Sequence, residues 1–321
     1  MLEKLNLSDN PGICEDEITL LTGLGSNLNL TDLRLWGVGL GDVSLQFLVA
    51  VLHRLSCLEN LYLSKNNLGA TGTQPFGAIH QPIVSLKVLR LSCNKIGDVC
   101  LKSLMHVLHH LSHLEELDLR YNNIGNEGME PFAAIQQPVR LQNLYLQHNK
   151  IGDVCLKSLA GVMHHLSCLK HLDLSNNNVR DEGMEALSTT LHHAPCMEVL
   201  NLKDNPVMEV GIKGFAQTIG IMPALKEMKL SSVQTVNLDD TAAMSITSML
   251  TRLPMLECLH LLNISMSTAG FQALAAGMEE HTTLQTLGFA EHLIPEGVDT
   301  NKIGTKITFQ LFSQVGDENM V

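Results

Sequence analysis

One hydrophobic pattern recurs along almost the whole chain. The motif LxxLxLxxN begins eleven times, and the interval between successive starts is 28 residues in eight of ten cases, with one of 27 and one of 31. The starts are Leu2, Leu30, Leu58, Leu86, Leu114, Leu141, Leu169, Met197, Leu225, Leu256 and Leu284. A nearly constant period of this length indicates a tandem-repeat array rather than ordinary globular domains.

Each repeat predicts one strand followed by one helix. The alternating leucines at the fourth and sixth positions, such as Leu117 and Leu119, are typical of a strand with one buried face. A turn such as residues 96–98 follows, and the apolar residues between 101 and 111 then recur at helical spacing. One strand and one helix bury little alone, so we expect the repeats to stack and share a core.

The spacing of the elements predicts the overall architecture. Parallel strands stack about 4.8 Å apart, whereas neighbouring helices need about 8–10 Å, so the array must curve. We predict an α/β solenoid, an open horseshoe of about eleven 28-residue repeats over residues 1–292, with a concave parallel sheet and convex helices. The asparagine at the ninth position, as in Asn94 and Asn122, is expected to link neighbouring repeats in a ladder.

A second, longer period marks the repeats as alternating pairs. The ten residues 95–104 return unchanged at 150–159, and residues 122–130 return in similar form at 177–185. With the 28-residue period, this pairing resembles the leucine-rich repeat superfamily. It looks most like the ribonuclease-inhibitor-like branch, and is similar to the C-terminal repeat region of NOD-like receptors.

The resemblance implies a protein-binding module rather than an enzyme. The leading interpretation is the sensing or autoinhibitory region of an intracellular NOD-like receptor, with a role in innate immunity. The alternatives are a freestanding ribonuclease-inhibitor-like enzyme inhibitor, or a GTPase-activating regulator similar to the Ran GTPase-activating proteins. Those activators generally end in a long acidic tract, which this chain lacks.

The ends and the ninth repeat depart from the pattern. Leu2 opens the first repeat directly after Met1, which favours a further domain upstream over a truncated product, because solenoid ends need caps. Residues 293–321 lose the motif and are expected to be irregular, or to cap the sheet edge with a strand at residues 307–311. Three extra residues before Leu256 predict a local distortion in the ninth repeat.

The repeat register sorts the aromatic side chains by face. Positions two, three, five, seven and eight should point into the concavity, and the tryptophan Trp36 and all three tyrosines, Tyr62, Tyr121 and Tyr145, occupy such positions. Tyrosine and tryptophan are enriched where proteins bind one another. The alternative is that these rings lie on strands because aromatic residues pair well across a sheet.

Charged residues complete the candidate surface. By register the concave face carries ten basic and thirteen acidic residues, a net charge of −3 against −12 for the chain. Such a mixed face suits a protein partner better than a nucleic acid, although these charges also fit a face that is merely solvated. The candidate partner-binding residues are Arg34, Trp36, Tyr62, Arg90, Asp118, Arg120, Tyr121, Tyr145 and Asp173.

Other kinds of site find little support in the sequence. It has no GxxxxGK[ST] loop, GxSxG elbow, HExxH pair or GxGxxG turn, so we expect no enzyme activity and no cofactor. Four histidines, at 164, 165, 192 and 193, should cluster on the convex side. Because the helix dipole explains histidine at a helix C-terminus, we expect no metal site.

The distribution of cysteine and apolar residues bears on the compartment. The eight cysteines are scattered without a CxxC pair, unlike a disulfide framework, and the N-terminus shows no signal-peptide pattern. No run of about 18 apolar residues occurs, which argues against a membrane span. We therefore expect a cytoplasmic protein with a protein partner, bound to neither nucleic acid nor membrane.

Overall fold

The computed structural model describes residues 2–11, 29–52, 54–69, 85–106, 110–127, 135, 137–298 and 308–311. Its strands are β1 (Lys4–Asn6), β2 (Asp32–Arg34), β3 (Asn60–Tyr62), β4 (Val88–Arg90), β5 (Glu116–Asp118), β6 (Asn143–Tyr145), β7 (His171–Asp173), β8 (Val199–Asn201), β9 (Glu227–Leu238), β10 (Cys258–Met266), β11 (Thr286–Phe289) and β12 (Thr308–Leu311). The helices are α2 (Asp42–Leu52), α3 (Asp98–His106), α4 (Asp153–Gly161), α5 (Asp181–Ser188), α6 (Glu209–Thr218), α7 (Asp240–Leu250) and α8 (Thr268–Glu280), with 3-10 turns η4 (Met163–His165), η5 (Leu191–His193) and η6 (Glu291–Leu293).

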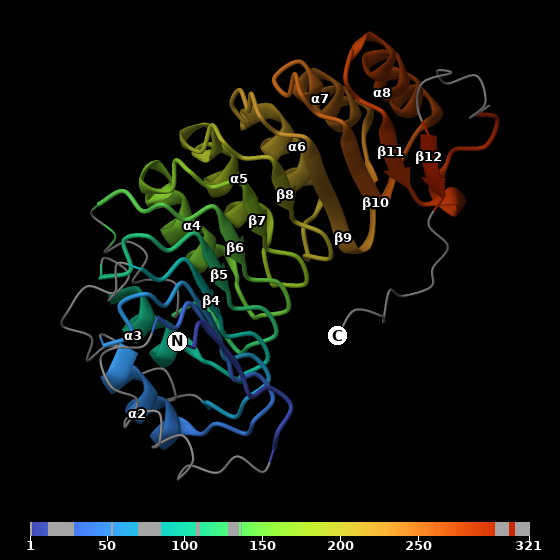
Figure 1. Cartoon of the computed structure of the whole chain (residues 1–321). Helices are drawn as coiled ribbons and strands as arrows, with labels where there is room; N and C mark the ends of the chain where they lie inside the picture. The colour runs from blue at the N-terminus through green and yellow to red at the C-terminus, as the bar shows by residue number, and fades with distance from the viewer. Residues whose placement is uncertain are drawn as a thin grey trace.

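Within the described residues, all twelve strands form one sheet in the order in which they occur in the sequence. Every neighbouring pair is parallel, and the central leucine of each early strand faces its equivalent one repeat later, as Leu33 faces Leu61. The sheet lines the inner side of an open arc and the helices lie outside it (Figure 1). The predicted open α/β solenoid is confirmed.

The core lies between the sheet and the helices. Leu117 and Leu119, at the fourth and sixth positions of their repeat, are both 0% exposed, and the helix residues Leu101 and Leu104 belong to the same buried cluster. Phe215 is also fully buried.

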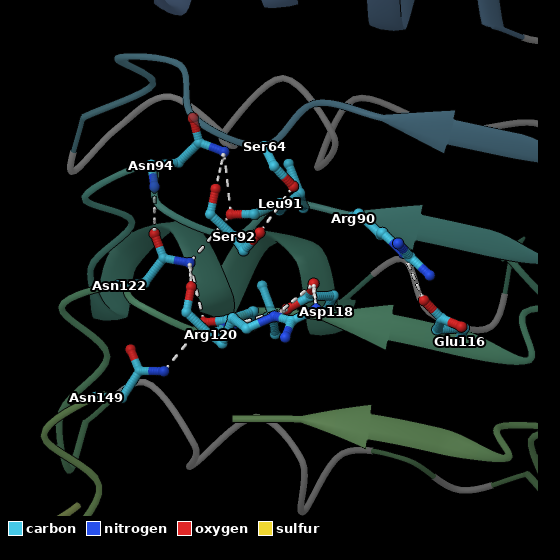
Figure 2. A network of polar contacts seen from close by, with 11 residues as sticks. Ser64, Arg90, Leu91, Ser92, Asn94, Glu116, Asp118, Arg120, Asn122 and Asn149 are labelled. Atoms are coloured by element: carbon cyan, nitrogen blue, oxygen red, sulfur yellow. Dashed lines mark hydrogen bonds and ion pairs between the residues drawn. The ribbon is translucent and has the colours of Figure 1, made fainter. Parts of the chain in front are cut away.

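The predicted asparagine ladder is present along the edge of the sheet. The side-chain oxygen of Asn122 accepts hydrogen bonds from the backbone N–H of Asn94 (3.0 Å) and of Ile96 (2.9 Å). Its amide nitrogen donates to the carbonyls of Leu91 and Leu119. Asn94, Asn122 and Asn149 stand in one column beside the strand ends (Figure 2). Each asparagine thereby satisfies backbone groups of two repeats in a place closed to water.

A left-handed turn directly precedes each of these asparagines. Non-glycine residues at the eighth position with positive φ, including Lys65, Tyr121 and His148, have φ between 52° and 57°. This backbone conformation is uncommon outside glycine, asparagine and aspartate. It turns the chain sharply away from the sheet, so position-eight side chains lie at the rim of the concave face rather than on its floor.

The convex helices are joined through their first turns. The Asp153 carboxylate at the start of α4 accepts hydrogen bonds from the backbone N–H of Arg180 (2.7 Å) and of Gly183 (3.0 Å) in the next repeat. A Cβ atom on Gly211 would lie 2.8 Å from the Cα of Asp181, which explains the small residue there. Successive helix starts therefore approach each other closely at these positions.

The ninth repeat departs from the pattern by extending its strand. β9 has 12 residues and β10 has 9, whereas most strands have 3, and the register between them shifts between Leu262 and Ile264. Figure 1 shows these two strands as the longest in the arc. The extra residues of the ninth repeat are accommodated as a bulge in a longer sheet segment, so the predicted distortion is confirmed and takes this form.

A strand pairs with the edge of the eleventh repeat. β12 runs parallel to β11, with Phe309 opposite Leu287. The division of the chain at residue 292 stays a prediction. Within the described residues, no helix is both long enough and apolar enough to cross a membrane.

Candidate partner-binding surface on the concave sheet

Six of the nine predicted surface residues form one row across adjacent strands. Strand pairing places Arg34, Tyr62, Arg90, Asp118, Tyr145 and Asp173 directly beside one another from β2 to β7. We call this set the central row. All six occupy the fifth position of their repeats, and neighbouring strands lie about 4.8 Å apart, so each side chain is in reach of the next.

Tyr62 is held between two arginines. The guanidinium carbon of Arg34 lies 5.0 Å from the centre of its ring, and that of Arg90 lies 5.3 Å from it. A cation over an aromatic face at such distances stabilises the pair by about 0.5–1 kcal/mol where water has access. The ring is therefore fixed in orientation while its edge remains open to the concavity.

Carboxylates fix the two arginines in turn. The Arg34 Nε lies 2.8 Å from Asp32 Oδ1, and the Arg90 Nε lies 2.7 Å from Glu116 Oε1. The hydrogen bond and the charge of Asp32 raise the pKa of Arg34 above its usual value. Because each cation has an acidic partner, this part of the row is rigid and close to neutral overall. Such a surface favours a protein of complementary shape over a polyanion.

A second cation–aromatic pair continues the row. The guanidinium carbon of Arg120 lies 5.5 Å from the centre of the Tyr145 ring, and its Nη2 lies 2.9 Å from Asp118 Oδ2. Burial lowers the pKa of Arg120, but the hydrogen bond and charge of Asp118 outweigh this effect and raise it overall. Asp118 is only 1% exposed, so it orients Arg120 instead of offering surface itself (Figure 2).

Two further aromatic contacts extend toward the rim. The Lys65 ammonium lies 5.7 Å from the centre of the Trp36 ring. Tyr121, 44% exposed, stacks on His148 with ring centroids 4.1 Å apart and planes 9° apart. Both contacts join side chains of neighbouring repeats and hold flat apolar faces at the mouth of the concavity.

Asp173 closes the row with a polar contact rather than an aromatic one. Its carboxylate accepts hydrogen bonds from the Ser175 hydroxyl (2.6 Å) and from the Asn201 amide (3.0 Å). The structure thus brings eight of the nine predicted residues into cation–aromatic, stacking or ion-pair contacts, and Asp173 lies at the end of that group.

Some contributors were not selected from the sequence. Asp32, Glu116, Lys65 and His148 anchor the rings and cations described above. The repeat register could have indicated them. Each of these residues lies either two residues from the side chain that it supports or in the neighbouring repeat.

His148 should make the free energy of unfolding depend on pH. Burial lowers its pKa from the usual 6.5, and the charge of Asp173 opposes this only in part. As the pH falls through 6.5 the unfolded chain takes up the proton first, so the free energy of unfolding should decrease toward the lower folded pKa. We expect His148→Asn to reduce this decrease. Asparagine already occupies the equivalent position of the next repeat, at Asn176. Denaturant titrations above and below pH 6.5 would measure it, and an unchanged pH dependence would contradict it.

The predicted convex histidine cluster is present. The rings of His164 and His165 have centroids 3.9 Å apart, those of His192 and His193 are 4.0 Å apart, and His164 and His193 are 6.3 Å apart. The pKa of His193 is lowered by burial and then by His192, which favours neutral rings. Metal-type donor groups converge elsewhere in the described chain, on Glu227, Cys258 and His260.

Comparison with known protein families points to the same repeat. The family model described as Leucine Rich repeat matches residues 84–105, 110–133 and 165–188. The chain is 27% identical to the ribonuclease inhibitor of Sus scrofa over 164 residues, half of this chain and 36% of that protein. It is 30% identical to NACHT, LRR and PYD domains-containing protein 12 of Homo sapiens over 160 residues, 49% of this chain and 15% of that protein.

Solved structures agree on the fold. An internalin from Listeria monocytogenes superimposes with a TM-score of 0.55 at 18% identity, covering 98% of this chain and 88% of the internalin chain. The matches to the two curated relatives span well under half of those proteins' lengths. The matched family model describes a structural repeat and names no catalytic activity. The chain contains leucine-rich repeats and, over about half of its length, is similar to the ribonuclease inhibitor and to the NACHT, LRR and PYD domains-containing proteins.

Proposed function

We propose that the chain binds a protein partner through the central row and the neighbouring Trp36, Arg120 and Tyr121. The observation that carries the proposal is the alternation of cations and rings, Arg34–Tyr62–Arg90 followed by Arg120–Tyr145. Aromatic and arginine side chains supply most of the binding energy at protein interfaces, above all when they are already ordered. This alternation orders them before a partner arrives.

The context that we propose is the sensing or autoinhibitory region of an intracellular NOD-like receptor. Sequence similarity to the NACHT, LRR and PYD domains-containing proteins supports it. The described cysteines that are free, among them Cys57, Cys168 and Cys196, are compatible with a reducing cytoplasm. Paired charges along the row favour a protein over a nucleic acid or an anionic membrane.

The binding prediction concerns the two tyrosines of the row. We expect Tyr62→Ala with Tyr145→Ala to weaken partner binding by at least about 2 kcal/mol, because both rings are anchors. The free energy of unfolding should fall by about 1.5–3 kcal/mol, since the two rings together lose three cation–aromatic contacts. Binding to a purified partner and urea denaturation would measure the two effects, and Tyr62→Phe should preserve both.

A photo-crosslinking residue would identify the partner and test the surface. Benzoylphenylalanine at position 62 should give a specific adduct, whereas the same residue at Met244, which is 60% exposed on the convex helix α7, should not. Identical adducts at the two positions, or adducts at position 244 alone, would contradict the assignment.

A second candidate function is inhibition of a ribonuclease. The similarity to the Sus scrofa ribonuclease inhibitor over half of this chain favours it. The assay is direct: stoichiometric chain should abolish the cleavage of RNA by a pancreatic-type ribonuclease, and the double tyrosine variant should not. Unchanged cleavage with wild-type chain would exclude this function and leave the receptor proposal standing.

A further inference from the structure

Three side chains of metal-binding type converge on the concave sheet away from the central row. A carboxylate oxygen of Glu227, the Sγ of Cys258 and a ring nitrogen of His260 all lie within 4.8 Å of one another. The Cys258 Sγ is 2.9 Å from the His260 Nε2. His260 is 8% exposed, and the other two residues are partly buried.

The sheet itself brings these residues together. Cys258 on β10 faces Glu227 on β9 directly, and His260 lies two residues beyond Cys258. Alternate residues of a strand point to the same face, so Cys258 and His260 share the concave side. Both strands belong to the lengthened pair, and a site held by two hydrogen-bonded strands is more precise than one on loops.

We propose that Glu227, Cys258 and His260 form a binding site for a zinc-class ion that links the ninth and tenth repeats. Thiolate, imidazole and carboxylate are the ligands that zinc takes in proteins, at about 2.0–2.3 Å. Tetrahedral bonds of that length separate the donor atoms by about 3.3–3.8 Å, so small side-chain rotations suffice here. The thiol selects a soft ion over magnesium or calcium.

The surroundings complete the site. Binding replaces the Cys258 thiol proton, which passes to the solvent, so thiolate and carboxylate together bring two negative charges to a divalent ion. Lys229 Nζ lies 2.8 Å from one carboxylate oxygen of Glu227, and the carboxylate group offers a second oxygen to the ion. Thr286 on β11 lies directly opposite Cys258 in the sheet, within reach of its side chain.

Three protein ligands leave the fourth position open. Side chains of a parallel strand stand roughly perpendicular to the sheet, and Glu227 is about one-third exposed, so this position faces the concavity. Water or a partner's side chain would fill it. The site thus differs from the central row, since it lies on the lengthened strands and its ligand is an ion, not a protein surface.

The test is zinc binding by the full 321-residue chain. Calorimetry with Zn²⁺ should show one tight site in the wild type, and Co²⁺ should give thiolate-to-metal charge-transfer absorption. Cys258→Ser should weaken zinc binding by more than about 100-fold, because it removes a ligand rather than a residue that merely supports one. His260→Gln should act in the same direction, and circular dichroism would verify that each variant folds.

Matched controls separate this site from the other candidates. Cys196→Ser removes an exposed thiol and should leave the tight site intact. The double variant His164→Gln with His193→Gln breaks the convex histidine cluster and should also leave it intact. If Cys258→Ser binds zinc as tightly as the wild type, or if only the double histidine variant loses binding, the proposal is wrong.

Discussion

Leu119→Asp should unfold the fifth repeat, to which Leu119 belongs, together with the repeats on both sides of it. Leu119 is 0% exposed and lies where the sheet packs on the convex helices. A carboxylate there has no partner, and burying an uncompensated charge costs more than about 4 kcal/mol, a large part of the 5–15 kcal/mol that stabilises a typical domain. Because each repeat is stabilised by its neighbours, the loss should spread along the array. Circular dichroism and urea denaturation would measure it.

The control is the same change in chemistry at an exposed site. Val154, one repeat further on in α4, is 51% exposed, so Val154→Asp should alter the free energy of unfolding by less than about 0.5 kcal/mol. A folded Leu119→Asp protein with wild-type melting would show that position six does not face the core. The assignment of every concave residue depends on the same register and would fail with it.

The pairing of equivalent residues on neighbouring strands is the part of this structure that the sequence predicts best. In a solenoid each repeat contacts its neighbours, so a pattern of 28 residues determines both the local elements and their pairing. Leu33 and Leu61 are adjacent because they hold equivalent positions. The same reasoning places Arg34, Tyr62 and Arg90 in one row before any coordinates are known. Few folds permit this, because elsewhere pairing depends on contacts between unlike segments.

Side-chain partners within the concave face are harder to predict. Asp118 has the position of an exposed residue, yet Arg120 folds over it and leaves it 1% exposed. The stacking of Tyr121 on His148 depends on a left-handed turn at both residues, which neither residue type signals on its own. Such contacts depend on rotamers, and the repeat pattern constrains the backbone rather than the side-chain torsions.

The convergence of Glu227, Cys258 and His260 shows the same limit. No spacing motif contains it, since Glu227 and Cys258 are 31 residues apart, across the longest interval between repeat starts. Counting from the ninth repeat start would have aligned Cys258 with Glu227 at position three, and His260 at position five. The signal existed in the register, but a metal site also requires donor atoms that meet, and only coordinates show this.

Asn122→Ala should destabilise the array by about 2–5 kcal/mol through two lost acceptor contacts. The backbone N–H groups of Asn94 and Ile96 both donate to the Asn122 side chain, which is 7% exposed, and leaving a buried donor unsatisfied costs about 1–3 kcal/mol. The carbonyl oxygens of Leu91 and Leu119, which accept hydrogen bonds from the Asn122 amide, are less affected. Each also accepts a hydrogen bond from the side chain of a second asparagine. Asn123→Ala is the matched control, since that neighbouring side chain is exposed. Urea denaturation of the two variants would compare them. Equal loss in both would mean that the ladder contributes no more than the intrinsic preference for asparagine in this turn, and that the leucine core alone holds neighbouring repeats together.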